Sequence, residues 1–391
     1  MSRKLAVVCL LLVLALPALS QRHENPQIAT WEAKFDLDNE LYPSYVLVMS
    51  GPNTRNSSTP GYYGDSSGLA EVWIVPSIPN AQVHVEVQIE GWTSLSELDV
   101  TLPEAGKRYR VAPFLRYDFA RLAETDQSIP ATVTYTARVN GTDLGRDMLS
   151  IRVRSVNDVP FYASTSLSGE PQDLTPLFAG YVNESHTFIP KVLQEALKYK
   201  AINAFSGYQV DPAGVRLQVF AIWNVLQRRQ LHYSNITTPS AVSPSGQVYS
   251  QAVRFIDQSI DSQQANCVDG SVLFASILYK IGIEPILVLM PGHMFVGYYL
   301  DADHKKFEFL ETTMIGAGHQ PGASNIAFSQ WLHPVELSES WGQFVAAIQC
   351  ANQVFEQEVR PAINQSKPQY KFIDIAKFRQ AGINAIPRPV R

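Results

Sequence analysis

The sequence predicts an α+β protein in which a β-sandwich precedes a domain of helices and one antiparallel sheet. Short segments of alternating polarity, separated by Gly, Pro, Asn and Asp, fill the first part of the chain. Segments with apolar residues three and four positions apart follow, and then come three strand-like runs. The 391 residues exceed the usual domain of about 100 to 200, so two domains are expected.

The first twenty residues predict a cleavable export signal. They combine a basic start at Arg3 and Lys4, an apolar run, and the small residues Ala18 and Ser20 before the expected cut. The apolar run is shorter than the roughly 20 residues that span a membrane, and no later run is long enough. We therefore expect a secreted or periplasmic protein with no integral membrane segment after signal removal.

The predicted β-sandwich domain covers residues 28–154. Its clearest alternating segments are residues 82–89, 108–115, 131–139 and 148–153. Residues 50–69, rich in Gly, Ser, Asn and Pro, predict a long loop within it. Residues 155–173 mix Pro, Gly and Ser without periodicity, which indicates a linker.

The second predicted domain covers residues 174–391 and begins with helices. Apolar spacing predicts amphipathic helices over residues 174–182, 188–204 and 215–230. Asp211, directly before Pro212, predicts the start of the third helix. A Ser, Thr and Pro loop is expected over residues 234–248, and irregular structure over residues 251–259.

A helix from Cys267 to Ile281, ended by Gly282, is the central element of this domain. Asp269 and Ser271 are expected to cap or line its start. Three strands are predicted after it, over residues 285–290, 294–300 and 307–314, and residues 328–359 and 373–381 are expected to form helices that cover the sheet.

Cys267 and His293 form a candidate nucleophile and base. A thiol attacks a carbonyl as the thiolate, and the free N–H groups at a helix start favour that charged form. His293 follows in PGHMFVGYY, where a strand running back over the helix start would bring it to Cys267. A disulfide to Cys350, the one other cysteine beyond the signal, is the alternative fate of this thiol.

Glu311, in FEFLETTMIG, is the candidate third member of the set. A histidine base needs its ring oriented by a neighbouring carboxylate or amide. If residues 294–300 pair antiparallel with residues 307–313 around a tight turn, His293 lies opposite Glu311. The sequence therefore predicts a catalytic set of Cys267, His293 and Glu311.

Three stretches carry a family resemblance: NCVDGSVLFASILYKIGIEPILVL, PGHMFVGYY and FEFLETTMI. They resemble the transglutaminase-like superfamily, whose fold is papain-type. There a Cys opens the core helix, a His starts one strand, an Asp lies on the next, and a Thr commonly follows two residues later, as Thr313 does here. The resemblance covers about residues 248–316 and implies Cys267 as nucleophile, His293 as base and then acid, and Glu311 as orienting carboxylate, in the place of the usual Asp.

The resemblance implies an exported, thiol-dependent acyl-transfer enzyme that acts on peptide or Gln carboxamide bonds, as a protease or amidase rather than a cross-linker. Its partner would be a protein or peptide substrate, with cell-wall peptide included. The oxyanion would be bound by the backbone N–H of Cys267 and a side-chain donor. We expect that donor to be Gln264, with Gln263 and Asn266 as alternatives.

Two other interpretations stay open. The cell-wall peptidases called NlpC/P60 also open a helix with Cys and follow it with a His strand, but they usually carry Asp-Cys-Ser-Gly where this chain has Asn-Cys-Val-Asp at residues 266–269. A binding or scaffolding protein would keep the fold without turnover, and Glu311 in the place of Asp is compatible with that.

Other function classes lack a signal in the sequence. Acidic residues outnumber basic ones by 36 to 31, which gives a formal net charge of −5 and does not favour nucleic acid as a partner. We find no glycine-rich phosphate loop or dinucleotide fingerprint, so no cofactor is implied. No metal site is expected either, because the histidines and acids of the C-terminal half lack ligand spacing: His304, His319, His333, Asp301 and Asp303.

Overall fold

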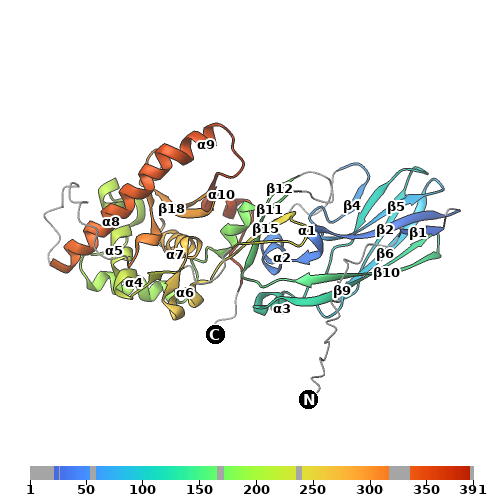
Figure 1. The fold of residues 1–391 in the computed structure, drawn as a ribbon, viewed down its shortest axis with the longest axis horizontal. Coiled ribbons are helices and arrows are strands. Elements are labelled where there is room, and N and C mark those ends of the chain that lie inside the picture. Colours follow the sequence, from blue (N-terminus) through green and yellow to red (C-terminus); the bar gives the residue numbers. More distant parts are fainter. Residues whose placement is uncertain are drawn as a thin grey trace, which may run out of the picture. The chain divides into compact units, whose positions relative to one another are not determined.

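The computed structural model describes residues 22–25, 27–52, 59–164, 171–234, 240–316 and 335–387. The predicted signal over residues 1–20 lies outside them. The described chain is a mixture of helices and several sheets, consistent with the predicted α+β class (Figure 1). It divides into two compact units, the first made of Met1–Phe35, Ser58–Arg116 and Ala131–Ile151.

Two five-stranded sheets organise the described first unit, except that Glu40–Leu41 and the Arg152–Val153 end of its partner strand belong to the second unit. One has the order β1-β2-β5-β8-β4, and the other has the order β3-β10-β9-β6-β7. The strands of the first sheet are β1 (Arg22–Asn25), β2 (Ala29–Phe35), β5 (Ala70–Pro76), β8 (Tyr109–Ala112) and β4 (Tyr62–Gly64). Those of the second are β10 (Thr142–Val153), β9 (Ile129–Val139), β6 (Ala81–Ile89) and β7 (Ser96–Leu102), with β3 (Glu40–Leu41) on the last residues of β10.

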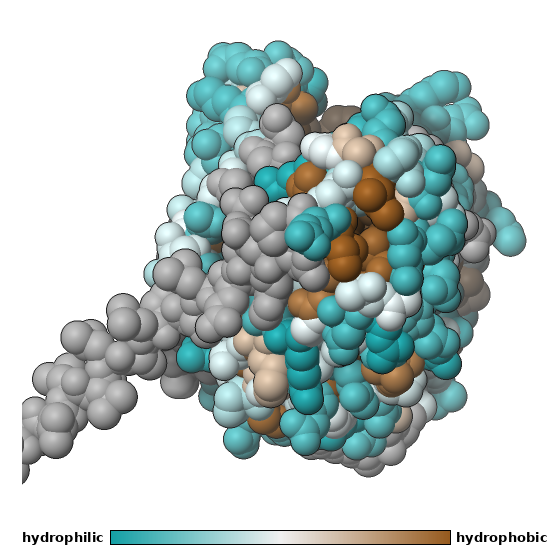
Figure 2. All heavy atoms as spheres, turned by 90° about the vertical axis from the view of Figure 1, so that its right-hand side faces the viewer, coloured by the Kyte–Doolittle hydropathy of each residue, from teal (hydrophilic) through white to brown (hydrophobic). Residues whose placement is uncertain are grey.

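Alternating polarity explains why these strands form. Every second residue of β2 and β6 is buried, and successive side chains of a strand point to opposite faces, so one face of each sheet is covered. Trp31 donates from Nε1 to the Leu144 carbonyl at 3.1 Å, and the Tyr135 hydroxyl donates to the Lys34 carbonyl at 2.9 Å, which links the two sheets. Figure 2 shows a mostly hydrophilic surface on this side of the molecule, with a larger apolar area near the centre and smaller ones around it.

The compact units do not follow the predicted division at residue 154. Asp36–Ser57 and Tyr117–Pro130 belong with the second unit, together with Arg152–Arg391. These segments carry two helices that the sequence did not suggest, α2 (Pro43–Met49) and α3 (Phe119–Glu124), beside the short α1 (Asp36–Asn39). Residues 43–48 of α2 are all buried, so this helix lacks the polar face on which the periodicity argument depends.

The linker prediction over residues 155–173 is wrong where the chain is described. Residues Asp158–Ala163 form β11 and Gln172–Asp173 form β12, in a sheet of order β12-β11-β15-β14. The other strands are β15 (Val248–Ala252) and β14 (Ser240–Val242), which lie within segments predicted as loop and irregular structure. Pro160 masked the strand signal; β11 accommodates it where the register with β15 shifts, between Pro160 and Tyr162.

Helices follow in the order that the periodicity predicted, with shorter bounds. Residues 174–182 hold a 3-10 helix, η1 (Thr175–Tyr181), followed by α4 (Phe188–Lys198), η2 (Gly207–Gln209) and α5 (Pro212–Arg228). The predicted start of α5 is confirmed, because the Asp211 side chain accepts a hydrogen bond from the Gly214 amide at 2.8 Å. Part of the segment expected to be irregular forms α6 (Ile256–Ser262).

The last sheet has the order β19-β18-β17-β20 and lies between helices. The predicted helix is confirmed as α7 (Cys267–Lys280), and the predicted strands as β17 (Pro285–Met290), β18 (His293–Tyr299) and the shorter β19 (Phe307–Leu310). The 3-10 helix η3 (Thr312–Met314) occupies the expected end of the third strand. Part of the helix predicted over residues 373–381 is instead β20 (Lys371–Asp374), followed by α10 (Ile375–Gln380).

An aromatic and aliphatic core joins this sheet to the helices that cover one of its faces. Ile286, Val288, Phe295 and Phe309 are fully buried against residues of α8 (Val335–Val354) and of the π-helical turn η4 (Phe355–Val359), which continues into α9 (Arg360–Asn364). Helix α7 packs on β17 and β18, and Figure 1 shows β18 between α7 and α8. Among the described helices, none is both long and apolar enough to cross a membrane.

Candidate active site

Cys267 is the first residue of α7, and the polar residues around it explain why the helix starts there. The Asn266 carboxamide oxygen accepts the amides of Val268 and Asp269 at 2.8 and 2.9 Å. In return, the Asp269 carboxylate accepts the Asn266 amide at 3.0 Å, which completes a capping box. The expected capping role of Asp269 is confirmed, and Ser271 lines the same turn by donating to the Cys267 carbonyl at 2.7 Å.

A buried ion pair anchors this helix start. Asp269 is fully buried and accepts the Arg254 amide at 2.7 Å and the Arg254 guanidinium at 2.9 Å. Burial raises the pKa of Asp269, while the amides of Asn266 and Arg254 and the Arg254 charge act in the opposite direction. Because the carboxylate is shared between the cap and Arg254, the segment before α6 and the first turn of α7 are held together.

His293 opens β18 and contacts both other members of the predicted set. Gly292 precedes it with a φ of 72°, a left-handed conformation that glycine adopts readily at the turn from β17. Nε2 of His293 lies 2.7 Å from the Glu311 carboxylate. Cys267 lines the same cavity as the ring and contributes to the raised pKa of His293.

Glu311 reaches His293 although the strand register differs from the predicted one. The predicted pairing would place Val296 opposite Glu308, whereas Val296 pairs with Leu310. Glu311 follows β19 directly and caps η3, where its second oxygen accepts the Thr313 amide at 3.0 Å and the Thr313 hydroxyl at 2.6 Å. Thr313 therefore fixes the carboxylate that orients the imidazole.

The charges of the three residues depend on one another. Burial alone would favour neutral His293, but hydrogen bonds to Cys267 and Glu311, together with their charges, raise the pKa of His293 to about 10. Burial likewise opposes the charge on Glu311, and the hydrogen bonds from His293 and Thr313 lower its pKa below the ordinary value. The arrangement thus favours an imidazolium between a carboxylate and a thiol.

A glycine lets the Glu311 segment approach the helix closely. A Cβ atom on Gly270 would lie 2.7 Å from Oγ1 and 3.0 Å from Cβ of Thr312. Gly270 belongs to the second turn of α7, and Thr312 follows Glu311 directly. The absence of a side chain at residue 270 therefore sets the distance between Glu311 and the helix that carries Cys267.

A cavity of about 720 Å³ opens beside Cys267 and His293. Strands β11 and β15 contribute Phe161, Tyr162 and Tyr249 to its lining, and residues 289–292 at the end of β17 close another side. Every lining residue belongs to the second unit. The cavity gives the Cys267 sulfur access to a substrate larger than water.

The structure fits one of the two expected oxyanion donors, the backbone N–H of Cys267, and does not fit the other, Gln264. The Asn266 side chain accepts the backbone N–H groups of Val268 and Asp269. It does not accept the N–H of Cys267, which is the third of the first turn and can bind an oxyanion. Gln264 lies in the short β16 (Gln264–Ala265), which pairs with β13 (His232–Tyr233), and it is not among the residues that line the cavity. The Gln263 side chain donates instead to the Arg229 carbonyl at 3.1 Å.

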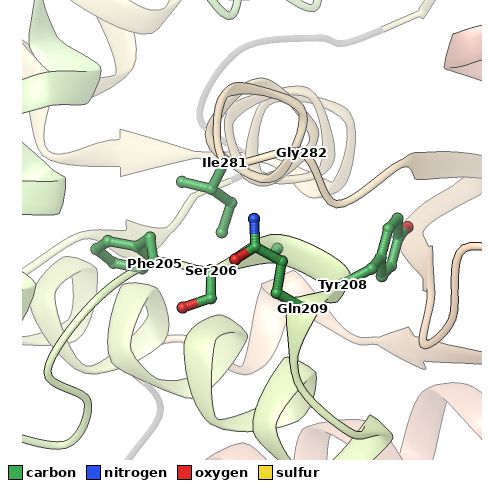
Figure 3. A pocket seen from close by; sticks show the side chains of 7 residues that line it. Phe205, Ser206, Tyr208, Gln209, Ile281 and Gly282 are labelled. Atoms are coloured by element: carbon green, nitrogen blue, oxygen red, sulfur yellow. The ribbon is translucent and has the colours of Figure 1, made fainter.

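A second cavity, of about 530 Å³, lies at the opposite end of α7 (Figure 3). It is lined by Phe205, Ser206 and η2 together with Ile281 and Gly282, which follow the helix. The lining contains no thiol, imidazole or carboxylate, so it offers none of the groups that the first cavity combines.

The described residues that could together hold a metal ion are not those considered from the sequence. His304 pairs with Glu284 at 3.0 Å and stacks on Tyr299, while His319 and His333 lie outside the described residues. In the described part of the first unit, His84, Glu86 and Glu97 bring ligand atoms within 4.8 Å of one another. His84 already contacts Glu86 and Asp99, at 3.1 and 2.8 Å.

Sequence reasoning missed the aromatic wall of the cavity. Phe161 and Tyr162 fell in the predicted linker, and Tyr249 fell between a predicted loop and an irregular segment. A short apolar run around Pro160, from Val159 to Ala163, was the available signal. Cys350 is exposed and free, as is the half-buried Cys267, so no disulfide joins them.

No family model matches the chain, and a search of curated proteins found no match.

Proposed function

We propose that this protein is a thiol-dependent acyl-transfer enzyme that acts on peptide or Gln carboxamide bonds. The Glu311 carboxylate on Nε2 of His293, with Cys267 and His293 lining one cavity, is the observation that carries the proposal. A histidine with one nitrogen on a carboxylate and the other on a thiol is the arrangement that activates a nucleophile.

In the proposed reaction, the Cys267 thiolate forms an S–C bond to the substrate carbonyl carbon. The oxyanion accepts the Cys267 amide, and the imidazolium of His293 gives its proton to the departing nitrogen as the C–N bond breaks. The neutral ring then takes a proton from water, whose oxygen attacks the thioester and releases an acid and the free thiolate. Glu311 holds the ring through both steps and stabilises its charged form.

We propose hydrolysis, as a protease or amidase, over cross-linking. An amine acceptor would follow the same route as water, so the choice depends on which nucleophile reaches the thioester. A protein or peptide is the substrate in either case, and cell-wall peptide belongs to that class.

We also propose a transglutaminase-like, papain-type fold for the second unit and a β-sandwich for the first. The helix that opens with Cys267, the His293 strand beside it and the acid after the next strand support the first assignment. Alternating burial along two five-stranded sheets, bridged by Trp31 and Tyr135, supports the second. The export signal that the sequence predicts over residues 1–20 supports a secreted or periplasmic location.

Iodoacetamide labelling of Cys267 against pH tests the proposal, with peptide-resolved mass spectrometry on the wild type and on His293→Ala. We expect wild-type labelling well below pH ~8.5, where an ordinary thiol ionises, and a shift towards that pH in the variant. Cys350 is an internal reference, because burial, together with the Glu311 charge, raises its pKa. Slow Cys267 labelling with the same profile in both proteins would instead favour a binding or scaffolding protein.

A further inference from the structure

An aromatic wall stands beside the nucleophile. Phe161 and Tyr162 of β11 and Tyr249 of β15 line the cavity that contains Cys267 and His293. Consecutive strand residues normally point to opposite faces, but the register shift between Pro160 and Tyr162 allows both Phe161 and Tyr162 to face the cavity. A regular β11 would place only one of Phe161 and Tyr162 beside Tyr249. The irregularity places both there, so three rings line the cavity.

Packing holds these rings in place. Phe161 stacks on the buried Phe178 with centroids 6.2 Å apart, and it lies 6.4 Å from Tyr249. Tyr162 and Tyr249 are partners across the two strands, with centroids 6.0 Å apart. A wall of mutually packed rings is preorganised, so a ligand that binds it loses little to side-chain ordering.

The wall leaves apolar surface in water. Tyr249 is 39% exposed although it contacts two other rings, and Val242, its partner on β14, is 53% exposed. Exposed aromatic surface next to a reactive group is typical of a binding site, since burying it against a ligand is favourable.

The charged pair of the cavity adjoins the wall, because Asp173 lies opposite Tyr162 on the neighbouring strand β12. Of its lining residues, Asp173 and Lys371 are the charged ones besides His293, and they form an ion pair at 2.5 Å. Asp173 also accepts the Thr175 hydroxyl at 2.6 Å. Because Asp173 and Lys371 pair with each other, neither is expected to select a substrate side chain of opposite charge.

We propose that Phe161, Tyr162 and Tyr249 form a specificity subsite for an aromatic or other large apolar side chain on the acyl part of the substrate, next to the carbonyl that Cys267 attacks. This inference rests on the proposed acyl transfer and adds the substrate class to it. Burial of such a side chain against the rings would hold the carbonyl at the sulfur.

Matched covalent probes test the subsite on the full chain. The probes are the chloromethyl ketones of acetyl-phenylalanine and acetyl-alanine, which alkylate Cys267 with loss of chloride, and iodoacetamide, which carries no side chain. We expect the phenylalanine probe to label wild-type Cys267 about tenfold faster than the alanine probe or more, the range for burying an aromatic group. In Tyr249→Ala this ratio should fall towards one, with each rate normalised to the iodoacetamide rate of the same protein.

Two controls separate the subsite from folding and from catalysis. Phe119→Ala removes a ring that is likewise exposed, at 41%, but lies outside the cavity, and it should keep the wild-type ratio. In Cys267→Ala, which cannot react, binding of acetyl-phenylalaninamide and acetyl-alaninamide by NMR titration tests the wall alone. Equal probe rates and equal affinities would overturn the subsite even if Cys267 is activated; preferential binding without an activated thiol would overturn the acyl transfer and keep the subsite.

Discussion

His84 and His293 are both held by carboxylates, but their surroundings differ in one respect. His84 lies on β6 with Asp99 on one ring nitrogen and Glu86 on the other, whereas His293 has Glu311 on Nε2 and lines one cavity with Cys267. Both pKa values are raised: that of His84 chiefly by its hydrogen bond to Asp99, and that of His293 by Cys267 and Glu311, against an opposing effect of burial.

The comparison shows that a carboxylate-held histidine is not in itself an indication of catalysis. Side chains of the two histidines are similarly exposed, at 23% and 28%, so burial does not separate them. What separates them is a thiol at a helix start and the larger cavity beside His293, of about 720 Å³ against about 280 Å³ beside His84. The predictions below test this difference.

The largest effect is expected from Glu311→Gln. The amide keeps the shape of the side chain but removes the charge that stabilises the imidazolium, and a hydrogen bond to a charged group contributes ~1.5–3 kcal/mol. The iodoacetamide rate at Cys267 should fall at pH 7 by about tenfold to a hundredfold. Glu311→Asp, which draws the carboxylate back by one methylene, should give an intermediate rate. Equal rates in all three proteins would mean that Glu311 does not act on the thiol.

Gly270→Ala should destabilise the protein by about 1–3 kcal/mol, because the new methyl group meets Thr312 at 2.7 Å. In an unobstructed helix the same change would be stabilising, since glycine is the poorer helix former. Urea unfolding measures the difference. Thr312→Ala in the same chain should relieve part of the loss, because it removes Oγ1 and leaves the 3.0 Å contact with Cβ. No relief at all would place the clash elsewhere.

The His293–Glu311 pair should give stability a defined pH window. A raised histidine pKa contributes stability that is complete below the ordinary value of 6.5 and is lost as pH rises towards about 10. The lowered Glu311 pKa contributes above its ordinary value of 4.5 and is lost as pH falls. The Tm difference between wild type and His293→Gln should therefore be greatest between pH 4.5 and 6.5 and shrink on either side; a flat difference would contradict the coupling.

The smallest effect is expected from His84→Gln, which is the matched control for the other histidine. It leaves every residue of the cavity in place, so iodoacetamide labelling of Cys267 should not change. Its partly exposed ion pairs suggest a stability change within about 1 kcal/mol. A clear drop in Cys267 reactivity would show that the two units are functionally coupled, and the contrast between the two histidines would then no longer hold.

Local signals in the chain carried much of the fold. The Asp211 cap, the helix from Cys267 to the glycine that follows it, and the strand over Pro285–Met290 depend on neighbouring residues, and each was predicted within a residue or two. Elements whose stability comes from burial on all sides were missed, as for α2, because they show no polar and apolar faces. A proline hid β11 in the same way.

The sequence by itself determined the chemistry that is available: a thiol at a capped helix start, a histidine after a turn and an acid at the end of the next strand. Only the tertiary structure decided the geometry. The register of β18 and β19 is set by packing between sheet and helices, Thr313 directs the Glu311 carboxylate, and Gly270 sets how closely that segment approaches α7. The aromatic wall likewise comes from strands far apart in sequence, whose pairing no local pattern specifies.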